Sequence, residues 1–219
     1  HEFRIFKNTS ENVLRLSADA IGSQWVNFRF SYEHGDRTGS GLNEDLLVEI
    51  GEQPAMRHYD LADRTRNRFN GLVNFTPNDR WLLGFNIARG NDDFDHSGFG
   101  PQEASYFTWG LAADVQLADG WVGGLSYKRE DYDGRQRSRQ ANPGQENDPA
   151  RDWTVKSGEI VNYFGLYLTT PRWRGTEARF SYDYSFAEGD YLYTIVPDGP
   201  LTPPNQLPLR PRGSPTVAI

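Results

Sequence analysis

The chain has 219 residues, a net charge of −7, no cysteine and a hydrophobic content of 37%. The lack of cysteine excludes disulfides, cysteine-ligated zinc and covalently bound c-type haem in this chain, and the negative charge argues against a nucleic-acid-binding surface. No run of about 18 apolar residues occurs, so the sequence contains no candidate transmembrane helix. The apolar content is low for a soluble core of this size, but it suffices if each strand needs only one apolar face.

Eight segments alternate apolar and polar residues with a period of two, which is typical of a β-strand with one apolar and one polar face. In chain order they cover 13–20, 25–33, 67–76, 80–89, 107–117, 121–130, 159–169 and 176–188. The clearest is the fifth, in which Phe107, Trp109 and Leu111 alternate with Thr108 and Gly110. Lengths near ten residues are what a tilted strand needs to cross a bilayer. We therefore predict an all-β fold, an antiparallel transmembrane β-barrel of the outer-membrane type.

The predicted connections are alternately short and long. Short turns are expected at 22–24, 77–79, 118–120 and 171–175, and long polar loops at 35–66, 90–103 and 131–157. Outer-membrane barrels have short periplasmic turns and longer external loops, whereas a soluble β-sandwich has no reason to sort its loops by length. Gly120, in the third short turn, is expected to take a positive φ.

Three tryptophans follow short turns directly: Trp25, Trp81 and Trp121. Three ordinary core tryptophans would be the plain interpretation. Their repeated placement favours an aromatic belt at one membrane interface.

The alternation also assigns side chains to two faces. The face predicted to line a polar lumen carries Arg15, Asp19, Asn27, Arg29, Asn70, Asn74, Asn86, Asp114, Gln116, Lys128, Arg179 and Asp183. The face predicted to meet lipid carries Phe28, Phe30, Phe69, Val73, Phe75, Trp81, Leu83, Phe85, Ile87, Phe107, Trp109, Leu111, Val115, Leu125, Phe180, Tyr182 and Tyr184. The lumen set mixes both signs of charge with amides, which suits a wet interior or a docked polar partner but not an ion filter of one sign. The alternative is the solvated face of a soluble sheet.

We interpret residues 1–219 as a single β-barrel domain in which 197–219 is a proline-rich loop or tail. About eight strands are visible. Eight can close alone, but side chains would fill so narrow a lumen and leave no room for a protein. We therefore expect the chain to be a fragment of a larger barrel. Two alternatives stay open: a diffusion porin or receptor-type transporter without a redox partner, and a secreted soluble β-sandwich that acts as a binding module.

Carboxylates cluster where the fourth predicted strand ends. Asp92, Asp93 and Asp95 offer the oxygen ligands that Ca²⁺ prefers, but their spacing lacks the Gly and Glu of an EF-hand loop, so a solvated loop is the favoured interpretation. The four histidines are isolated, and neither a catalytic triad nor a phosphate-binding loop is recognisable. We predict that the protein is not an enzyme.

Several short motifs resemble the MtrB/PioB family of outer-membrane barrels that associate with decahaem cytochromes. They are 37–40, 59–68, 76–79, 90–94, 97–100 and 148–153. The segment 59–68 (YDLADRTRNR) resembles the motif with which that family opens a strand, and the pieces match in order and spacing over most of 19–193. Two features depart from the family: its closing strands and terminal aromatic residue are missing, and 207–219 fits no family strand.

The resemblance implies a function. Barrels of this family act as insulating sheaths in the bacterial outer membrane. They hold a periplasmic multihaem cytochrome, with an extracellular cytochrome as a further partner, so that electrons cross the membrane. The haem then belongs to the partner, and this chain holds no cofactor apart from the calcium considered above. A closed sheet satisfies its own backbone hydrogen bonds and gives a polar protein a path through an insulating bilayer.

Overall fold

The computed structural model describes residues 6–43, 45, 47, 53–60, 62–94, 97–139 and 148–195. Eight long strands account for most of them. They are β1 (Phe6–Ser23), β2 (Val26–Leu42), β3 (Arg64–Asn78), β4 (Trp81–Asp93), β5 (Gly100–Gln116), β6 (Val122–Arg139), β7 (Asp152–Thr169) and β8 (Arg179–Ile195), with two short 3-10 helices, η1 (Ala118–Gly120) and η2 (Pro149–Arg151). The prediction of an all-β chain with eight strands is confirmed. None of the described helices has the length and apolar composition to span a bilayer.

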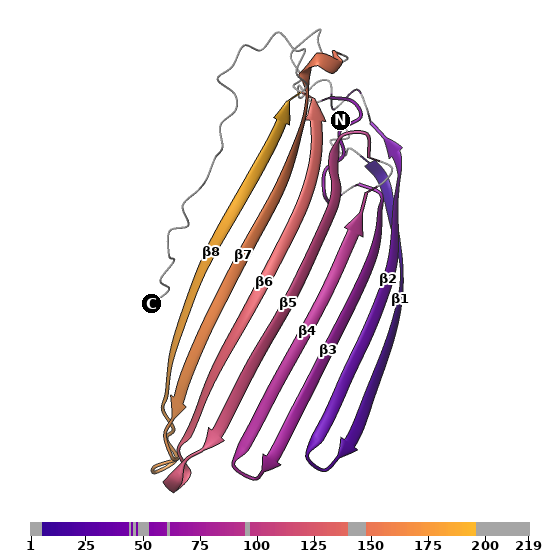
Figure 1. The fold of residues 1–219 in the computed structure, drawn as a ribbon. Helices are drawn as coiled ribbons and strands as arrows, with labels where there is room; N and C mark the ends of the chain where they lie inside the picture. Colours follow the sequence, from indigo (N-terminus) through magenta and orange to yellow (C-terminus); the bar gives the residue numbers. More distant parts are fainter. Residues whose placement is uncertain are drawn as a thin grey trace.

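The strands form one antiparallel sheet in which each strand pairs with its neighbours in sequence, in the order β1 to β8. Figure 1 shows them side by side in a single tilted layer, with the short turns at the bottom and the long connections at the top. Among the described residues β1 and β8 do not pair with each other, so both edges of the sheet are open. Because open edges are not viable in a lipid environment, a membrane-spanning sheet of this kind needs further strands to close it.

Every strand extends further toward the long connections than the sequence pattern predicts. β2 continues to Leu42 rather than ending near residue 33, β6 continues to Arg139, and β7 begins at Asp152. The predicted loops 35–66, 90–103 and 131–157 are therefore partly strand. In β2, β4 and β6 the added residues are mostly polar on both faces, so the period-two signal fades although the backbone ladder continues. In β7 and β8 the added residues include Trp153, Val155 and Leu192, which the predicted ranges leave out.

The short turns lie together at one end of the sheet (Figure 1). We call the half of the sheet at this end the short-turn half and the half at the long connections the long-loop half. In the third short turn, η1, Gly120 has φ 82°, as predicted, and Asp119 also has a positive φ of 60°. Trp25 lies in the β1–β2 turn itself, Trp81 begins β4, and Trp121 directly precedes β6. Trp173, in the fourth turn, is 70% exposed and adds a tryptophan that the prediction did not include. The expected grouping of tryptophans at one end of the sheet is present.

Within the described residues, no apolar core packs against the middle of this sheet. The buried apolar side chains of the described residues are Leu47, Ala62, Phe94 and Phe99, all in the long connections. A β-sandwich would instead bury the aromatic side chains of its strands between two layers. The β-sandwich alternative is therefore wrong for this fold, and the apolar strand residues remain exposed.

Candidate lumen and lipid-facing surfaces

The strand register divides the side chains between two faces. Residues directly opposite each other on an antiparallel ladder share a face. One continuous row reads Phe28, Val73, Phe85, Leu111, Tyr127, Phe164 and Tyr184. All seventeen residues of the lipid-facing prediction lie on this side, which we call the aromatic face, and all twelve of the lumen-facing prediction lie on the opposite, polar face. That one face meets lipid and the other an aqueous bore stays a prediction.

The aromatic face exposes large apolar side chains that no other described residue covers. Leu111 is 51% exposed, Leu125 65% and Phe180 64%. A contiguous apolar surface of this kind is rare on soluble monomers and marks contact with a partner or a membrane. The three rows that contain Trp81, Leu83 and Phe85 carry no charged residue, and we call them the apolar belt.

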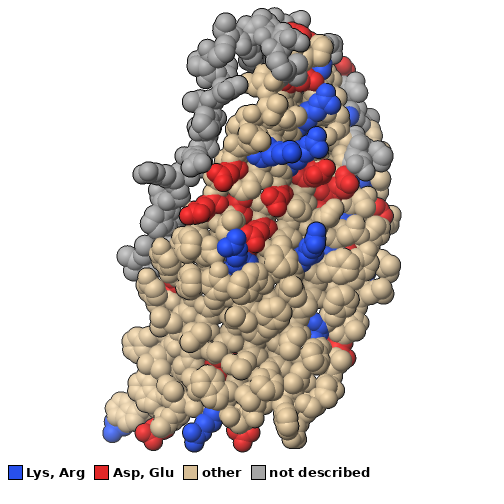
Figure 2. All heavy atoms as spheres, viewed as in Figure 1, with Lys and Arg blue, Asp and Glu red and all other residues tan. Residues whose placement is uncertain are grey.

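Charged residues are interspersed with apolar and polar ones on the aromatic face toward the long connections. The row of Arg89 also holds Asp131 and Glu188, and the rows beyond it hold further acidic and basic residues, among them Asp133 and Arg135. We call these rows the charged belt. Figure 2 shows this division, with bands of charge over the long-loop half of the sheet and a broad area without charge below them, apart from the turns. The end of the apolar belt therefore divides each strand into two chemically different parts.

In the short-turn half the polar face combines amide and small side chains with charged residues of both signs. Asn74 donates from Nδ2 to Asn27 Oδ1 at 3.1 Å, and Arg29 pairs with Asp19 at 2.6 Å. The row through Asn74 continues with Gly84, Ala112, Ser126, Gly165 and Asp183. Cross-strand hydrogen bonds and small side chains thus make this part of the polar face a smooth, wettable wall.

Two tyrosines of the polar face, Tyr167 in the short-turn half and Tyr106 in the long-loop half, lie over glycines instead of projecting from the sheet. Tyr167 on β7 reaches across Gly124 on β6, and its hydroxyl donates to Asp114 Oδ1 on β5 at 2.6 Å. A Cβ atom added at Gly124 would lie 2.2 Å from the Tyr167 ring, and one at Gly90 would lie 2.2 Å from the Tyr106 ring. The glycines are therefore required by close approach, and they let long side chains lie flat.

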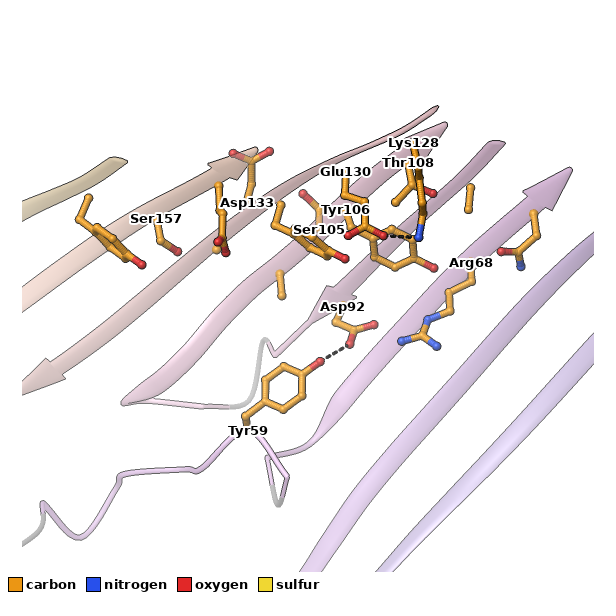
Figure 3. A pocket seen from close by; sticks show the side chains of 17 residues that line it. Tyr59, Arg68, Asp92, Ser105, Tyr106, Thr108, Lys128, Glu130, Asp133 and Ser157 are labelled. Carbon is orange, nitrogen blue, oxygen red and sulfur yellow. Dashed lines mark hydrogen bonds and ion pairs between the residues drawn. The ribbon is translucent and has the colours of Figure 1, made fainter. Parts of the chain in front are cut away.

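A cavity of about 640 Å³ opens on the polar face in the long-loop half, where Arg68, Lys128 and Glu130 line it. Figure 3 shows the Lys128 ammonium paired with Glu130, and Tyr59 reaching in from outside the sheet to Asp92. Both signs of charge face the same space. The cavity is therefore suited to a polar occupant but not to selection of one ion sign.

The weak calcium candidate is not assembled by the described residues. Asp95 lies outside them, and Asp92 and Asp93 are neighbours within β4, where successive side chains project to opposite faces. The Asp92 carboxylate accepts two hydrogen bonds from Arg66, at 2.8 and 2.7 Å, which already neutralise it. No cluster of three potential metal-ligating side chains occurs in the described part of the chain.

Sequence reasoning missed the network that surrounds Asp92. Burial alone would raise the pKa of the Asp92 carboxyl, but the hydrogen bonds and attraction of Arg66 lower it below its usual value. Arg64 and Arg66 belong to the motif 59–68, where basic residues recur at every second position and so share a face. That spacing is the available signal, although the predicted loop 35–66 covers Arg64 and Arg66.

A single antiparallel sheet with an exposed apolar belt, a polar opposite face and short turns at one end is the wall of an outer-membrane β-barrel. Residues 3–205 match the model of the outer membrane beta-barrel porin family MtrB/PioB, and the chain belongs to this family. Its location is accordingly the bacterial outer membrane. No curated protein matches the chain.

Solved receptor barrels share the fold. The ferripyoverdine receptor of the outer membrane of Pseudomonas aeruginosa, bound to ferripyoverdine, superposes with a TM-score of 0.55 at 15% identity, over 86% of this chain and 27% of that receptor. The FpvAI–pyocin S2 complex gives a TM-score of 0.53 at 14% identity, over 85% and 28%. At such identities the likeness concerns the fold alone, and this chain spans about a quarter of those receptors.

Proposed function

We propose that the barrel to which this sheet belongs encloses a multihaem c-type cytochrome and so carries electrons across the outer membrane. The single observation that supports this proposal most directly is the smooth polar wall of the short-turn half. Gly84, Ala112, Ser126 and Gly165 leave no long side chain projecting from this row between Asn74 and Asp183. A folded protein can approach such a wall closely.

The chemistry of the chain fits a sheath without a cofactor of its own. With no cysteine, it cannot attach a c-type haem covalently, so the redox centres belong to the enclosed partner. The barrel supplies insulation from lipid through the aromatic face and a wettable contact through the polar face. We expect no catalytic step in this chain.

The test is copurification from outer membranes. When the full-length barrel protein is extracted in mild detergent and purified, a protein that stains for haem should copurify with it. Ser126→Arg, which adds a long cation to the wall, should reduce the amount of copurified haem, and Ser126→Ala should leave it unchanged. Both variants should still show the heat-dependent gel migration of a folded barrel.

A diffusion porin gives a different result in the same experiment. No haem protein would copurify, and the purified barrel would pass small hydrophilic solutes at a rate that Ser126→Arg lowers. The mixed charge of the cavity on the polar face is compatible with that function, so haem copurification is what separates the two.

A further inference from the structure

The connection between β2 and β3 turns back over the polar face instead of extending away from the sheet. We refer to its described residues 53–60 and 62 as the inward segment. Arg37 on β2 lies on the polar face and donates from Nε and Nη2 to the Ala62 carbonyl oxygen at 3.0 and 2.8 Å, and from Nη2 to the Tyr59 carbonyl oxygen at 2.6 Å. A side chain of the wall thus binds the backbone of the segment at two points.

A second attachment comes from β3 and β4. The Tyr59 hydroxyl donates to Asp92 Oδ2 at 3.1 Å, as Figure 3 shows. Asp92 is held by Arg66 and, at 3.5 Å, by Arg64, which also pairs with Glu11 on β1 at 2.5 Å. Asp92 and Arg64 are both buried. Four neighbouring strands, β1 to β4, therefore contribute to one network beneath the inward segment.

Apolar packing holds the segment from its other side. The rings of Tyr59 and Phe94 lie 5.4 Å apart, and Phe94 and Ala62 are fully buried. Met56 pairs with Phe99 in a β-bridge, and the Arg57 amide donates to the Phe99 carbonyl oxygen at 3.0 Å. This small core ties the β2–β3 connection to the β4–β5 connection.

The fit is close enough to require glycine at one position. Gly100 has φ 106°, and a Cβ atom built there would lie 1.9 Å from the Arg57 carbonyl oxygen. The segment is consequently fixed against the β4–β5 connection as well as against the wall.

We propose that the inward segment is a fixed constriction that narrows the barrel's bore at the long-loop end. Polar solutes that move along the polar face reach the cavity beside Tyr59. Two cations, Arg68 and Lys128, and two carboxylates, Asp92 and Glu130, line this cavity. Because both signs of charge line this cavity, the constriction excludes solutes by size more than by charge. The inference depends on the polar face being the bore, and it does not depend on the cytochrome.

The experiment uses the full-length barrel, purified without a cytochrome and inserted into planar bilayers, in a form free of cysteine. Asp60, an exposed turn residue of the inward segment, is replaced in Asp60→Cys. Reaction with a bulky, membrane-impermeant thiol reagent should lower the single-channel conductance severalfold. Arg37→Ala, which removes the attachment to β2, should raise the conductance of the unmodified barrel.

Arg135→Cys is the matched control, because Arg135 lies in the charged belt of the aromatic face and its side chain is 50% exposed. It should react with the same reagent and leave the conductance unchanged. The proposal is overturned if modified Asp60→Cys conducts like the unmodified variant, or if Arg135→Cys shows the same loss. Heat-dependent gel migration verifies that each variant is folded. Failure of haem copurification would leave these conductance results unaffected, so the two proposals are tested separately.

Discussion

Along every strand the sheet passes from a short-turn half, with the apolar belt, to a long-loop half, with the charged belt. In the first half Leu111, Leu125 and Phe180 are at least half exposed, so the described sheet does not bury them, and we propose that lipid does. In the second half Arg64 and Asp92 are buried against one another and Phe94 is covered completely. The difference teaches that one continuous backbone ladder is stabilised by its surroundings at one end and by its own side chains at the other.

The largest expected effect is a difference in folding stability between arginine substitutions at two positions on the same strand and the same face. Leu111→Arg places a charge in the apolar belt and should destabilise the folded barrel by about 2–4 kcal/mol. Ser105→Arg, in the charged belt of β5, should change stability by about 0.5 kcal/mol or less. Phe85→Arg should behave like Leu111→Arg, and substitution of Gln116 or Asn86, on the polar face, should be tolerated. Urea titration of folding into lipid vesicles measures these differences, and equal losses at Leu111 and Ser105 would refute the two-belt division.

The second effect concerns the internal network of the long-loop half. Asp92→Ala removes the shared acceptor of Arg64, Arg66 and Tyr59, and hydrogen bonds to a charged group contribute about 1.5–3 kcal/mol. We expect a loss of that order. Glu103→Gln alters an exposed pair whose closest atoms are 3.9 Å apart, and such pairs contribute about 0–1 kcal/mol. If the two variants unfold at the same urea concentration, the network does not stabilise this half.

The third expected effect concerns two adjacent glycines in the short-turn half. A side chain added at one of them would be crowded, and a side chain added at the other would not. Gly124→Ala would drive a methyl group into Tyr167 and Asp114, and overpacking of this kind costs about 1–3 kcal/mol. Gly123→Ala meets nothing closer than 3.7 Å and should be nearly neutral. The same urea titration compares them. A neutral Gly124→Ala would show that Tyr167 does not lie against this wall.

The smallest effect is a pH dependence of the inward segment. Because the folded protein lowers the pKa of Asp92, its ion pairs contribute stability above the ordinary carboxyl pKa of about 3.9 and lose it as the pH falls through the folded value. Single-channel conductance should therefore rise only in strongly acidic solution, and Asp92→Asn should remove that part of the rise. A rise of the same size in Asp92→Asn would assign it to other groups.

The sequence predicted the short-turn half well because its two faces differ in chemistry. Phe107, Trp109 and Leu111 alternate with polar or small residues, and period-two alternation is read directly from the chain. The family resemblance, carried by motifs such as 59–68, was confirmed by the match over residues 3–205.

The long-loop half escaped prediction because alternation disappears when both faces are polar. The strand extensions to Leu42 and Arg139, for example, carry Arg, Asp, Gln and Ser in a pattern that also suits a solvated loop. The inward segment depends on contacts between residues distant in sequence, such as Arg37 with Ala62 and Tyr59 with Asp92. Local periodicity carries no information on those pairs.

The division of the strands between lipid and an aqueous bore can be tested most directly by labelling two adjacent residues of β5. Leu111→Cys and Ala112→Cys, each carrying an environment-sensitive fluorophore in the barrel reconstituted into vesicles, project to opposite faces. We predict that a quencher attached to lipid chains lowers the fluorescence of the label at residue 111. A water-soluble quencher should instead lower the fluorescence of the label at residue 112. Equal quenching of both labels by either reagent would contradict the account.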